Sequence, residues 1–244
     1  MKDQRDTLYA DPLAGAGLFT FDDNVARVFP DMIKRSVPGY STIIAMTGLL
    51  AGRYASPGSR LYDLGCSLGA STLAMRQNNP PRDCHIVAVD NSAAMLERCR
   101  VIIATDTQDT PVSLVCADLQ DVTIEDASVV VLNFTLQFVP VEERDRIIAR
   151  IQAGLRPGGI MVLSEKVRFN DPHLDALNID LHHQFKLANG YSELEVAQKR
   201  NALETVLLPE TLARHRRRIE EAGFSSCDVW FQCFNFASLV ALKA

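Results

Sequence analysis

The run Asp63–Gly69, DLGCSLG, decides the fold class of this chain. It continues the apolar segment Arg60–Leu64 and leads into a helix-forming stretch that starts at Ala70. Its two glycines, Gly65 and Gly69, allow a tight turn in which backbone N–H groups and small side chains approach a ligand closely. The run therefore predicts a strand, a ligand-binding turn and a helix in succession.

After Pro57-Gly58, short segments rich in Val, Ile and Leu alternate with helix-compatible stretches. Such alternation is typical of a parallel sheet covered by helices on both faces. The predicted strands are 60–64, 85–90, 112–117, 128–133 and 160–166, the helices between them are 70–77, 93–104 and 142–155, and segments 228–234 and 236–242 resemble an antiparallel hairpin. We therefore predict a Rossmann-like α/β fold with a seven-stranded, mostly parallel sheet.

The remaining segments are predicted as elaborations of a single domain that spans 1–244, because the sequence shows no repeat, no low-complexity tract and no linker. Residues 1–56 form a helical N-terminal extension, with a short helix at 31–36 and a longer one at 41–54. Residues 171–208 form a helical insertion after the fifth strand, and 210–222 is a last helix. The insertion should lie outside the carboxyl ends of the strands, where open α/β sheets bind ligands.

The composition limits the classes of partner and compartment. A formal charge of −5 disfavours stable nucleic-acid binding, which needs a basic surface. No apolar run is long enough to span a membrane, and the first residues lack the apolar core of a signal peptide. The six cysteines include no CxxC pair, so reduced thiols are the simplest interpretation. We expect a cytoplasmic protein with no membrane contact.

Asp90 ends the second predicted strand, about twenty residues after the glycine turn, where an acidic side chain suits the two hydroxyls of a ribose. Nicotinamide dinucleotides and S-adenosyl-L-methionine both carry that ribose. The turn lacks full GxGxxG spacing, and the carboxylate of Asp63 suits a sulfonium amino acid better than a pyrophosphate. The pattern therefore favours S-adenosyl-L-methionine. An alternative is that Asp90 caps the next helix together with Ser92.

Three further positions fit an adenosyl pocket. Asp118, after the third strand, can accept a hydrogen bond from the adenine amino group, and Leu119 can donate its backbone N–H to the ring. Asn133 ends the fourth strand beside the glycine turn, and a buried Asn there needs partners. Each residue taken alone also fits a turn or a cap. Together with Gly65 and Asp90 they place polar groups at successive strand ends.

This pattern resembles the class I S-adenosylmethionine-dependent methyltransferase fold. A more specific resemblance, to the carboxy-S-adenosylmethionine synthase family, extends over nearly the whole chain. It is carried by the runs FPDMIKRSVPGYS, YDLGCSLGASTL, VDNSAAMLERC, LNFTLQF, LSEK, HHQFKLANGYSELEVAQKR and WFQCFNFASLVALK. Several of these runs lie outside the shared methyltransferase core, and no characteristic position is substituted.

The resemblance implies that S-adenosyl-L-methionine and prephenate are converted to carboxy-S-adenosyl-L-methionine and phenylpyruvate, and that a second enzyme uses the product on a tRNA wobble uridine. It implies a site in which Arg200 is the catalytic residue that faces the new carboxylate. The ligand-binding set implied is Tyr40, Gly65, Cys66, Ser67, Asp90, Asn91, Asp118, Leu119, Asn133 and Arg200. Tyr40 and Arg200 enter only through the resemblance. We also expect a homodimer.

Several other patterns suggest weaker interpretations. Asp180, His182 and His183 do not predict a metal site, because adjacent helical histidines point about 100° apart; a place beside prephenate near Arg200 suits them better. The basic run 214–218 is predicted to be a solvated helix face rather than a tRNA contact. No metal site is expected.

Two other functions remain open at this point. One is a conventional S-adenosyl-L-methionine-dependent methyltransferase that acts on a small molecule or tRNA. The other is a module that binds S-adenosyl-L-methionine without catalysis. The first needs an acceptor nucleophile near the methyl group, and the second needs no cosubstrate at all.

Overall fold

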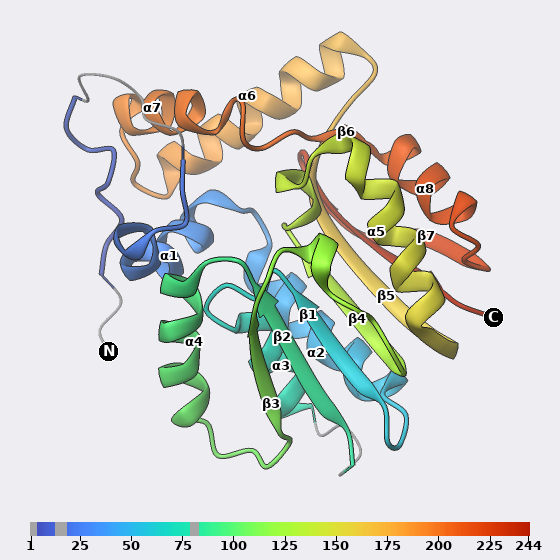
Figure 1. The fold of residues 1–244 in the computed structure, drawn as a ribbon. Helices are drawn as coiled ribbons and strands as arrows, with labels where there is room; N and C mark the ends of the chain where they lie inside the picture. Colours follow the sequence, from blue (N-terminus) through green and yellow to red (C-terminus); the bar gives the residue numbers. More distant parts are fainter. Residues whose placement is uncertain (1–3, 13–18, 79–82) are drawn as a thin grey trace.

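The central sheet of the computed structural model, which describes residues 4–12, 19–78 and 83–244, has the strand order β3-β2-β1-β4-β5-β8-β7 (Figure 1). The strands from β3 to β5 in that order are parallel, and β8 is antiparallel to both β5 and β7. The bounds are β1 Arg60–Leu64, β2 His85–Asp90, β3 Val112–Cys116, β4 Ala127–Asn133, β5 Leu155–Arg168, β7 Ser226–Cys233 and β8 Phe236–Leu242. The predicted Rossmann-like fold is confirmed.

The helices are α1 Asp23–Ser36, α2 Tyr40–Tyr54, α3 Ala70–Gln77, α4 Ala93–Ala104, α5 Val141–Gly154, α6 Pro172–Ala188, α7 Glu193–Leu203 and α8 Leu212–Glu221. They cover both faces of the sheet, as alternating strand side chains show. Val130 and Leu132 pack in one cluster with residues of α5 and α8. Val129 and Val131 pack in another with residues of α2 and α3. Both faces are apolar because both are buried.

The first helix is longer than predicted. The sequence placed a short helix at 31–36, but α1 starts at Asp23, after Asp22 caps it by accepting a hydrogen bond from the N–H of Val25 at 2.9 Å. Pro30 lies inside the helix and removes one backbone donor. The helix continues through it because its apolar face, including Val25 and Met32, is buried against α4 and α7 residues. Burial in the tertiary structure outweighs the local signal to break.

The fifth strand and the last helix also differ from the prediction. β5 begins at Leu155 and runs through Pro157, because Leu155 pairs with Ala127 and a register shift accommodates the extra residues. Glu210 and Thr211 form a two-residue strand, β6, on the end of β5, so α8 begins at Leu212. The strand order given above contains the seven predicted strands, and β6, which pairs only with β5, is an eighth strand.

The insertion forms two helices, α6 and α7, which lie together with α1 at the carboxyl end of the parallel strands, at the top of Figure 1. Contacts between residues that are distant in sequence hold the N-terminal extension against this insertion. The buried carboxylate of Asp6 accepts a hydrogen bond from the hydroxyl of Tyr191 at 2.5 Å and pairs with the ammonium of Lys199 at 3.4 Å. The guanidinium of Arg35 lies 3.8 Å from the centre of the Tyr191 ring.

The basic run on α8 is only partly solvated, so the prediction of a solvated face is wrong for two of its members. His215 and Arg218 are buried. The guanidinium of Arg218 pairs with Glu210 at 2.8 Å and with Asp145 at 2.6 Å. Glu210 also binds the fully buried Arg144 at 2.7 Å. The run thus supplies one of two buried arginines that share the Glu210 carboxylate between α5, β6 and α8.

We expect the substitution Arg144→Met to lower the free energy of unfolding by about 3 kcal/mol, because it removes the ion pair with Glu210 and the hydrogen bonds that Arg144 donates to the carbonyls of Val139 and Gln137. Urea denaturation would measure it. The control Arg146→Met changes an exposed arginine on the same helix and should cost less than about 0.5 kcal/mol. Equal losses in the two variants would contradict the role assigned to Arg144.

Candidate functional site

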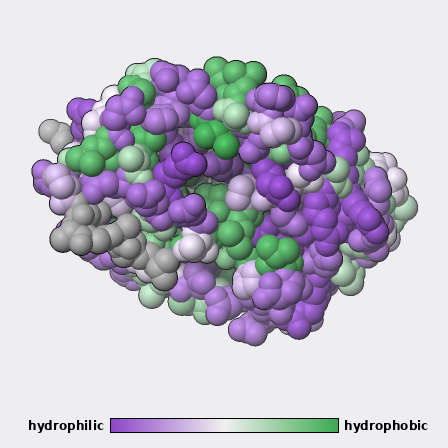
Figure 2. All heavy atoms as spheres, turned by 90° about the horizontal axis from the view of Figure 1, so that it is seen from above, coloured by the Kyte–Doolittle hydropathy of each residue, from purple (hydrophilic) through white to green (hydrophobic). Residues whose placement is uncertain are grey.

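A cavity of about 310 Å³ opens at the carboxyl ends of the parallel strands, between α1, the start of α2 and the insertion. Figure 2, which looks down on this end of the molecule, shows a hollow with hydrophobic atoms inside and hydrophilic ones around its rim. Nine of the ten predicted ligand-binding residues line it: Tyr40, Gly65, Cys66, Ser67, Asp90, Asn91, Asp118, Leu119 and Asn133. The tenth, Arg200, is exposed on α7 and does not line this cavity.

The glycine turn after β1 forms the floor of the cavity, and its first glycine is required by close packing. Gly65 has a φ of +82°, and a Cβ there would lie 2.2 Å from the hydroxyl of Thr135. The N–H groups of Gly65 and Cys66 both donate to the carbonyl of Val89 at 2.8 Å, which fixes the turn against β2. A side chain at position 65 would force the loops after β1 and β4 apart.

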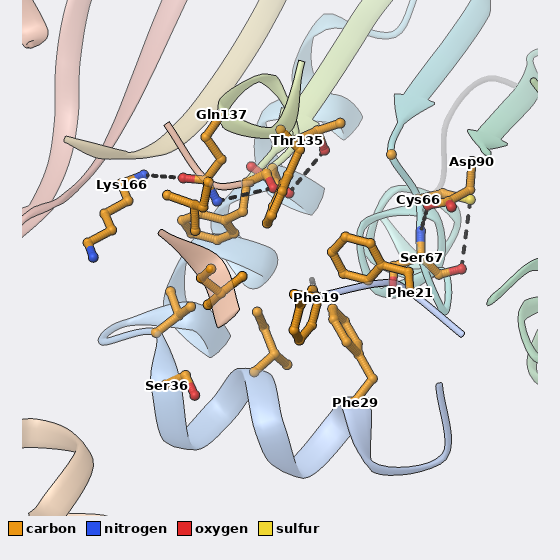
Figure 3. A pocket seen from close by; sticks show the side chains of 18 of the residues that line it. Phe19, Phe21, Phe29, Ser36, Cys66, Ser67, Asp90, Thr135, Gln137 and Lys166 are labelled. Carbon is orange, nitrogen blue, oxygen red and sulfur yellow. Dashed lines mark hydrogen bonds between the residues drawn. The ribbon is translucent and has the colours of Figure 1, made fainter. Parts of the chain in front are cut away.

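The carboxylate of Asp90 holds the turn in place. One oxygen accepts a hydrogen bond from the N–H of Ser67 at 2.8 Å, and the other accepts one from the N–H of Ser92 at 2.9 Å. The cap of α4 is the side chain of Ser92, which accepts from the N–H of Met95, so Asp90 is not itself the cap. Burial raises the pKa of Asp90. This carboxylate is therefore held rigidly at the cavity wall (Figure 3).

Asp63 does not take the place that the sequence suggested. Its buried carboxylate accepts a hydrogen bond from the hydroxyl of Thr72 at 2.6 Å, and it is not among the residues that line the cavity. Burial raises the pKa of Asp63 to about 6. The pKa of the Tyr40 hydroxyl is raised mainly by burial and, to a smaller extent, by the charge of Asp63. The charge of Asp63 therefore still acts on a residue that lines the cavity. Asp63 supports α3 from behind the turn.

At the next strand ends, Asn91 and Asp118 form a pair in which the Asn91 amide donates to the Asp118 carboxylate at 2.8 Å. Asn133 makes the contacts expected of a buried amide. Its NH₂ group donates to the hydroxyl of Ser71 at 2.9 Å, and its oxygen accepts from the hydroxyl of Ser164 at 2.6 Å. Asn133 thereby connects β4 with α3 and β5 at the cavity floor.

Aromatic side chains cover the middle of the cavity, and the sequence reasoning did not identify them. They are Phe19, Phe21, Phe29, Phe134, Phe138 and Phe236, in addition to Tyr40. Figure 3 shows the rings of Phe19, Phe21 and Phe29 standing between the Asp90 side and the opposite wall. The spacing of phenylalanines does not distinguish a cavity wall from an ordinary core. Only the close succession of Phe19, Phe21 and Phe29 in the extension hinted at a shared surface.

The wall opposite Asp90 is basic, and it too was missed. Lys166 on β5, Lys186 on α6 and Lys199 on α7 line it, together with His182. Figure 3 shows Lys166 and Ser36 on the side of the cavity away from Asp90. The ring Nε2 of His182 lies 2.8 Å from the carbonyl of Ser36, and burial lowers the pKa of His182 to about 2, so its ring is neutral. The only sequence signal for this wall is the polar character of the insertion.

Burial lowers the pKa of each of these three lysines. The pKa of Lys186 is lowered to about 7 by burial and, in addition, by the positive charges of Lys199, Lys166 and Arg200. Burial lowers the pKa of Lys199 to about 8 in spite of the neighbouring Asp6. The pKa of Lys166 is lowered by burial and by Arg200. The exposed Arg200 therefore lies close enough for its charge to act on this end of the cavity.

Two kinds of comparison identify the family. The methyltransferase domain family matches residues 61–159. Proteins named carboxy-S-adenosyl-L-methionine synthase are similar over the full length: one from Geobacter sp. is 60% identical and one from Trichlorobacter lovleyi is 61% identical, each over 244 residues and 100% of both chains. The chain belongs to the carboxy-S-adenosyl-L-methionine synthase family. It is therefore an enzyme of the transferase class, as the resemblance in its sequence implied.

A solved structure with low sequence identity has the same fold. Human N-acetylserotonin methyltransferase in complex with S-adenosyl-L-methionine has a TM-score of 0.61 and 15% identity, over 91% of this chain and 55% of that one. Binding of S-adenosyl-L-methionine follows from the family and the fold together. Among the residues that the structure describes, no helix is long and apolar enough to cross a membrane. The same part of the chain contains no group of three or more His, Cys, Asp or Glu residues suited to a metal ion.

The lowered pKa of Lys186 predicts a stability effect. Its pKa in the folded state, about 7, lies below the ordinary value of 10.5, so the unfolded chain binds this proton more tightly. The stability of the wild type therefore rises between about pH 7 and about pH 10 as the proton is lost. We expect Lys186→Met to raise Tm near pH 7 and to lose this advantage toward pH 10.

Differential scanning calorimetry at both ends of that range would measure the effect. The control Arg53→Met removes an exposed charge from the far end of α2 and should leave the pH dependence of Tm unchanged. A Lys186→Met variant that is less stable than the wild type near pH 7 would contradict the lowered pKa.

Proposed function

We propose that this enzyme uses prephenate to carboxylate the methyl group of S-adenosyl-L-methionine, giving carboxy-S-adenosyl-L-methionine and phenylpyruvate. A C–C bond forms between the methyl carbon and the carboxyl carbon that prephenate loses as carbon dioxide. The ring hydroxyl of prephenate leaves with the methyl proton as water, and the ring becomes aromatic. Atoms and charge balance without an external oxidant or reductant. Full-length similarity to proteins named for the product supports the proposal.

The observation that carries the proposal is the chemical contrast between the two ends of one cavity. The end with Asp90 and Asp118 offers acceptors for the hydroxyl and amino groups of an adenosyl ligand. The end with Lys166, Lys186 and Lys199 offers amines beside the neutral ring of His182 and suits an anion. Binding of a methyl donor alone would explain the end with Asp90 and Asp118. Binding of a second, anionic reactant beside it would also explain the end with the lysines.

We further propose the following ligand contacts. The backbone of Gly65, Cys66 and Ser67 follows the amino acid portion of the ligand, and Asp90 and Asn91 bind the ribose. Asp118 and Leu119 bind the adenine. Tyr40 and Asn133 border the region between them, where the tilted rings of Tyr40 and Phe134 lie 6.2 Å apart. Aromatic walls exclude water from this region, which lengthens the lifetime of a reactive carbon centre.

Arg200 is proposed to pair with the new carboxylate, because a planar guanidinium binds a carboxylate through two hydrogen bonds. Its exposed position leaves two routes to that carboxylate: a rotation toward the cavity of its own chain, or entry into the cavity of a second copy. A homodimer is proposed on the exposed apolar side chains of the insertion, Leu174, Leu177, Ile179 and Leu194, which a partner copy would cover. A cytoplasmic enzyme that supplies a tRNA wobble-uridine modification is the wider role we propose.

Asp90→Asn should weaken binding of S-adenosylhomocysteine about tenfold to about a hundredfold, since the amide loses the charge that strengthens hydrogen bonds from ligand hydroxyls. Isothermal titration calorimetry would measure Kd. The control Asp109→Asn neutralises an exposed carboxylate away from the cavity and should leave Kd within about twofold. An unchanged Kd for Asp90→Asn would remove Asp90 from the ribose site.

The activity itself is tested by mass spectrometry of the nucleoside formed from S-adenosyl-L-methionine with and without prephenate. We expect a product heavier by one carbon dioxide, dependent on prephenate, and its loss by about a hundredfold in Arg200→Ala. A product that lacks the methyl group instead would indicate a conventional methyltransferase. Binding of S-adenosyl-L-methionine with no turnover of either kind would indicate a module without catalysis.

A further inference from the structure

Three lysines from three separate elements converge on one end of the cavity. Lys166 comes from the end of β5, Lys186 from the last turn of α6 and Lys199 from α7. Figure 3 shows the side chain of Lys166 on the opposite side of the cavity from Asp90. Because β5 belongs to the sheet and the two helices belong to the insertion, the fold itself brings these charges together.

The charges on this wall are not balanced by the protein. Within the described residues, the ammonium groups of Lys166 and Lys186 make no hydrogen bond or ion pair. Lys199 alone is partnered, by Asp6 at 3.4 Å and by the hydroxyl of Ser36 at 3.1 Å. Asp175 acts on Lys166 only through its charge at longer range.

Such a group is costly for the fold. Burial removes hydration from these ammonium groups and so lowers the pKa of all three lysines, and repulsion from Lys199 and Lys166 lowers the pKa of Lys186 further. Hydrophobic residues of similar length would fill the same wall without this cost. A bound anion removes the repulsion, so the arrangement has a physical reason only when an anion is present.

We propose that Lys166, Lys186 and Lys199 form the subsite that binds the two carboxylates of a small dicarboxylate cosubstrate beside the adenosyl ligand. The inference rests on the proposed function, in which that cosubstrate is prephenate. Two carboxylates carry two negative charges, which matches the two lysines that lack a protein partner. Lys199, held by Asp6 and Ser36, then fixes the geometry of the subsite rather than supplying the main charge.

A competing assignment gives these lysines to the carboxylate of the methionine portion of S-adenosyl-L-methionine. That single carboxylate would need one ammonium, and the wall offers three. The two assignments differ in one measurable respect. Under ours, loss of a lysine weakens the dicarboxylate and spares the adenosyl ligand. Under the other, it weakens the adenosyl ligand directly.

The test compares the full-length wild type with Lys166→Met, Lys186→Met and Lys186→Arg. Each protein is first titrated with S-adenosylhomocysteine, which lacks the reacting methyl group, and the loaded protein is then titrated with prephenate. We expect each methionine variant to bind prephenate at least about tenfold more weakly, and Lys186→Arg to recover part of that loss. The Kd for S-adenosylhomocysteine should stay within about twofold. Arg53→Met is the charge-matched control, and Tm establishes that each variant is folded.

The outcomes separate the subsite from the reaction. Lysine-dependent prephenate binding without formation of carboxy-S-adenosyl-L-methionine supports the subsite and overturns the proposed function. Formation of that product with prephenate affinity unchanged in every lysine variant overturns the subsite and leaves the function standing. A loss of S-adenosylhomocysteine affinity as large as that of prephenate overturns the subsite in favour of the methionine carboxylate. A wild type that neither binds nor uses prephenate overturns both.

Discussion

The close approach of the loop after β1 to the loop after β4 is the constraint on which the cavity depends. Only a residue without a Cβ fits at position 65, because Thr135 of the neighbouring loop occupies that space. The second loop is held from below by the fully buried Glu165, which accepts hydrogen bonds from the N–H groups of Leu136 at 2.9 Å and Gln137 at 2.8 Å. Burial raises the pKa of Glu165 to about 8, so this support comes at an electrostatic cost.

From that contact the site extends in two chemically opposite directions. Toward β2 and β3 it presents carboxylates and backbone amides, and toward the insertion it presents amines. The sheet supplies the first set through strand ends that meet at one edge, a property of every parallel sheet of this kind. In the second set Lys166 lies on β5, whereas Lys186 and Lys199 lie on α6 and α7 of the insertion. The acidic end of the cavity is thus built by strand ends, and most of its basic end is built by the insertion.

The sequence predicted the parts of the molecule that local physics determines. Short apolar segments predicted β1 and β2 with their observed bounds. Residues at strand ends such as Asp90 and Asn133 were found because the fold class specifies what those positions do. The predictions were wrong where tertiary contacts determine the length of a helix or the burial of a side chain. Burial carries α1 through Pro30, and it turns Arg218 inward from an apparently solvated run.

The basic wall could not be predicted because its members are distant in sequence and individually unremarkable. A lysine on a polar helix is ordinarily a solvated charge, and only the packing of the insertion on the N-terminal extension turns Lys199 inward. Arg200 shows the reverse: the family resemblance points to it, while the structure leaves it exposed and outside the cavity of its own chain. Its part in the site stays a prediction.

The contact between Asp6 and Lys199 joins residues 193 positions apart. This contact contributes no stability until the chain has been synthesised as far as α7 and has become ordered, because the entropy of closing so long a loop must be met first. The parallel strands need no such closure. During folding the end of the cavity that the strand ends form can therefore exist before its basic wall does.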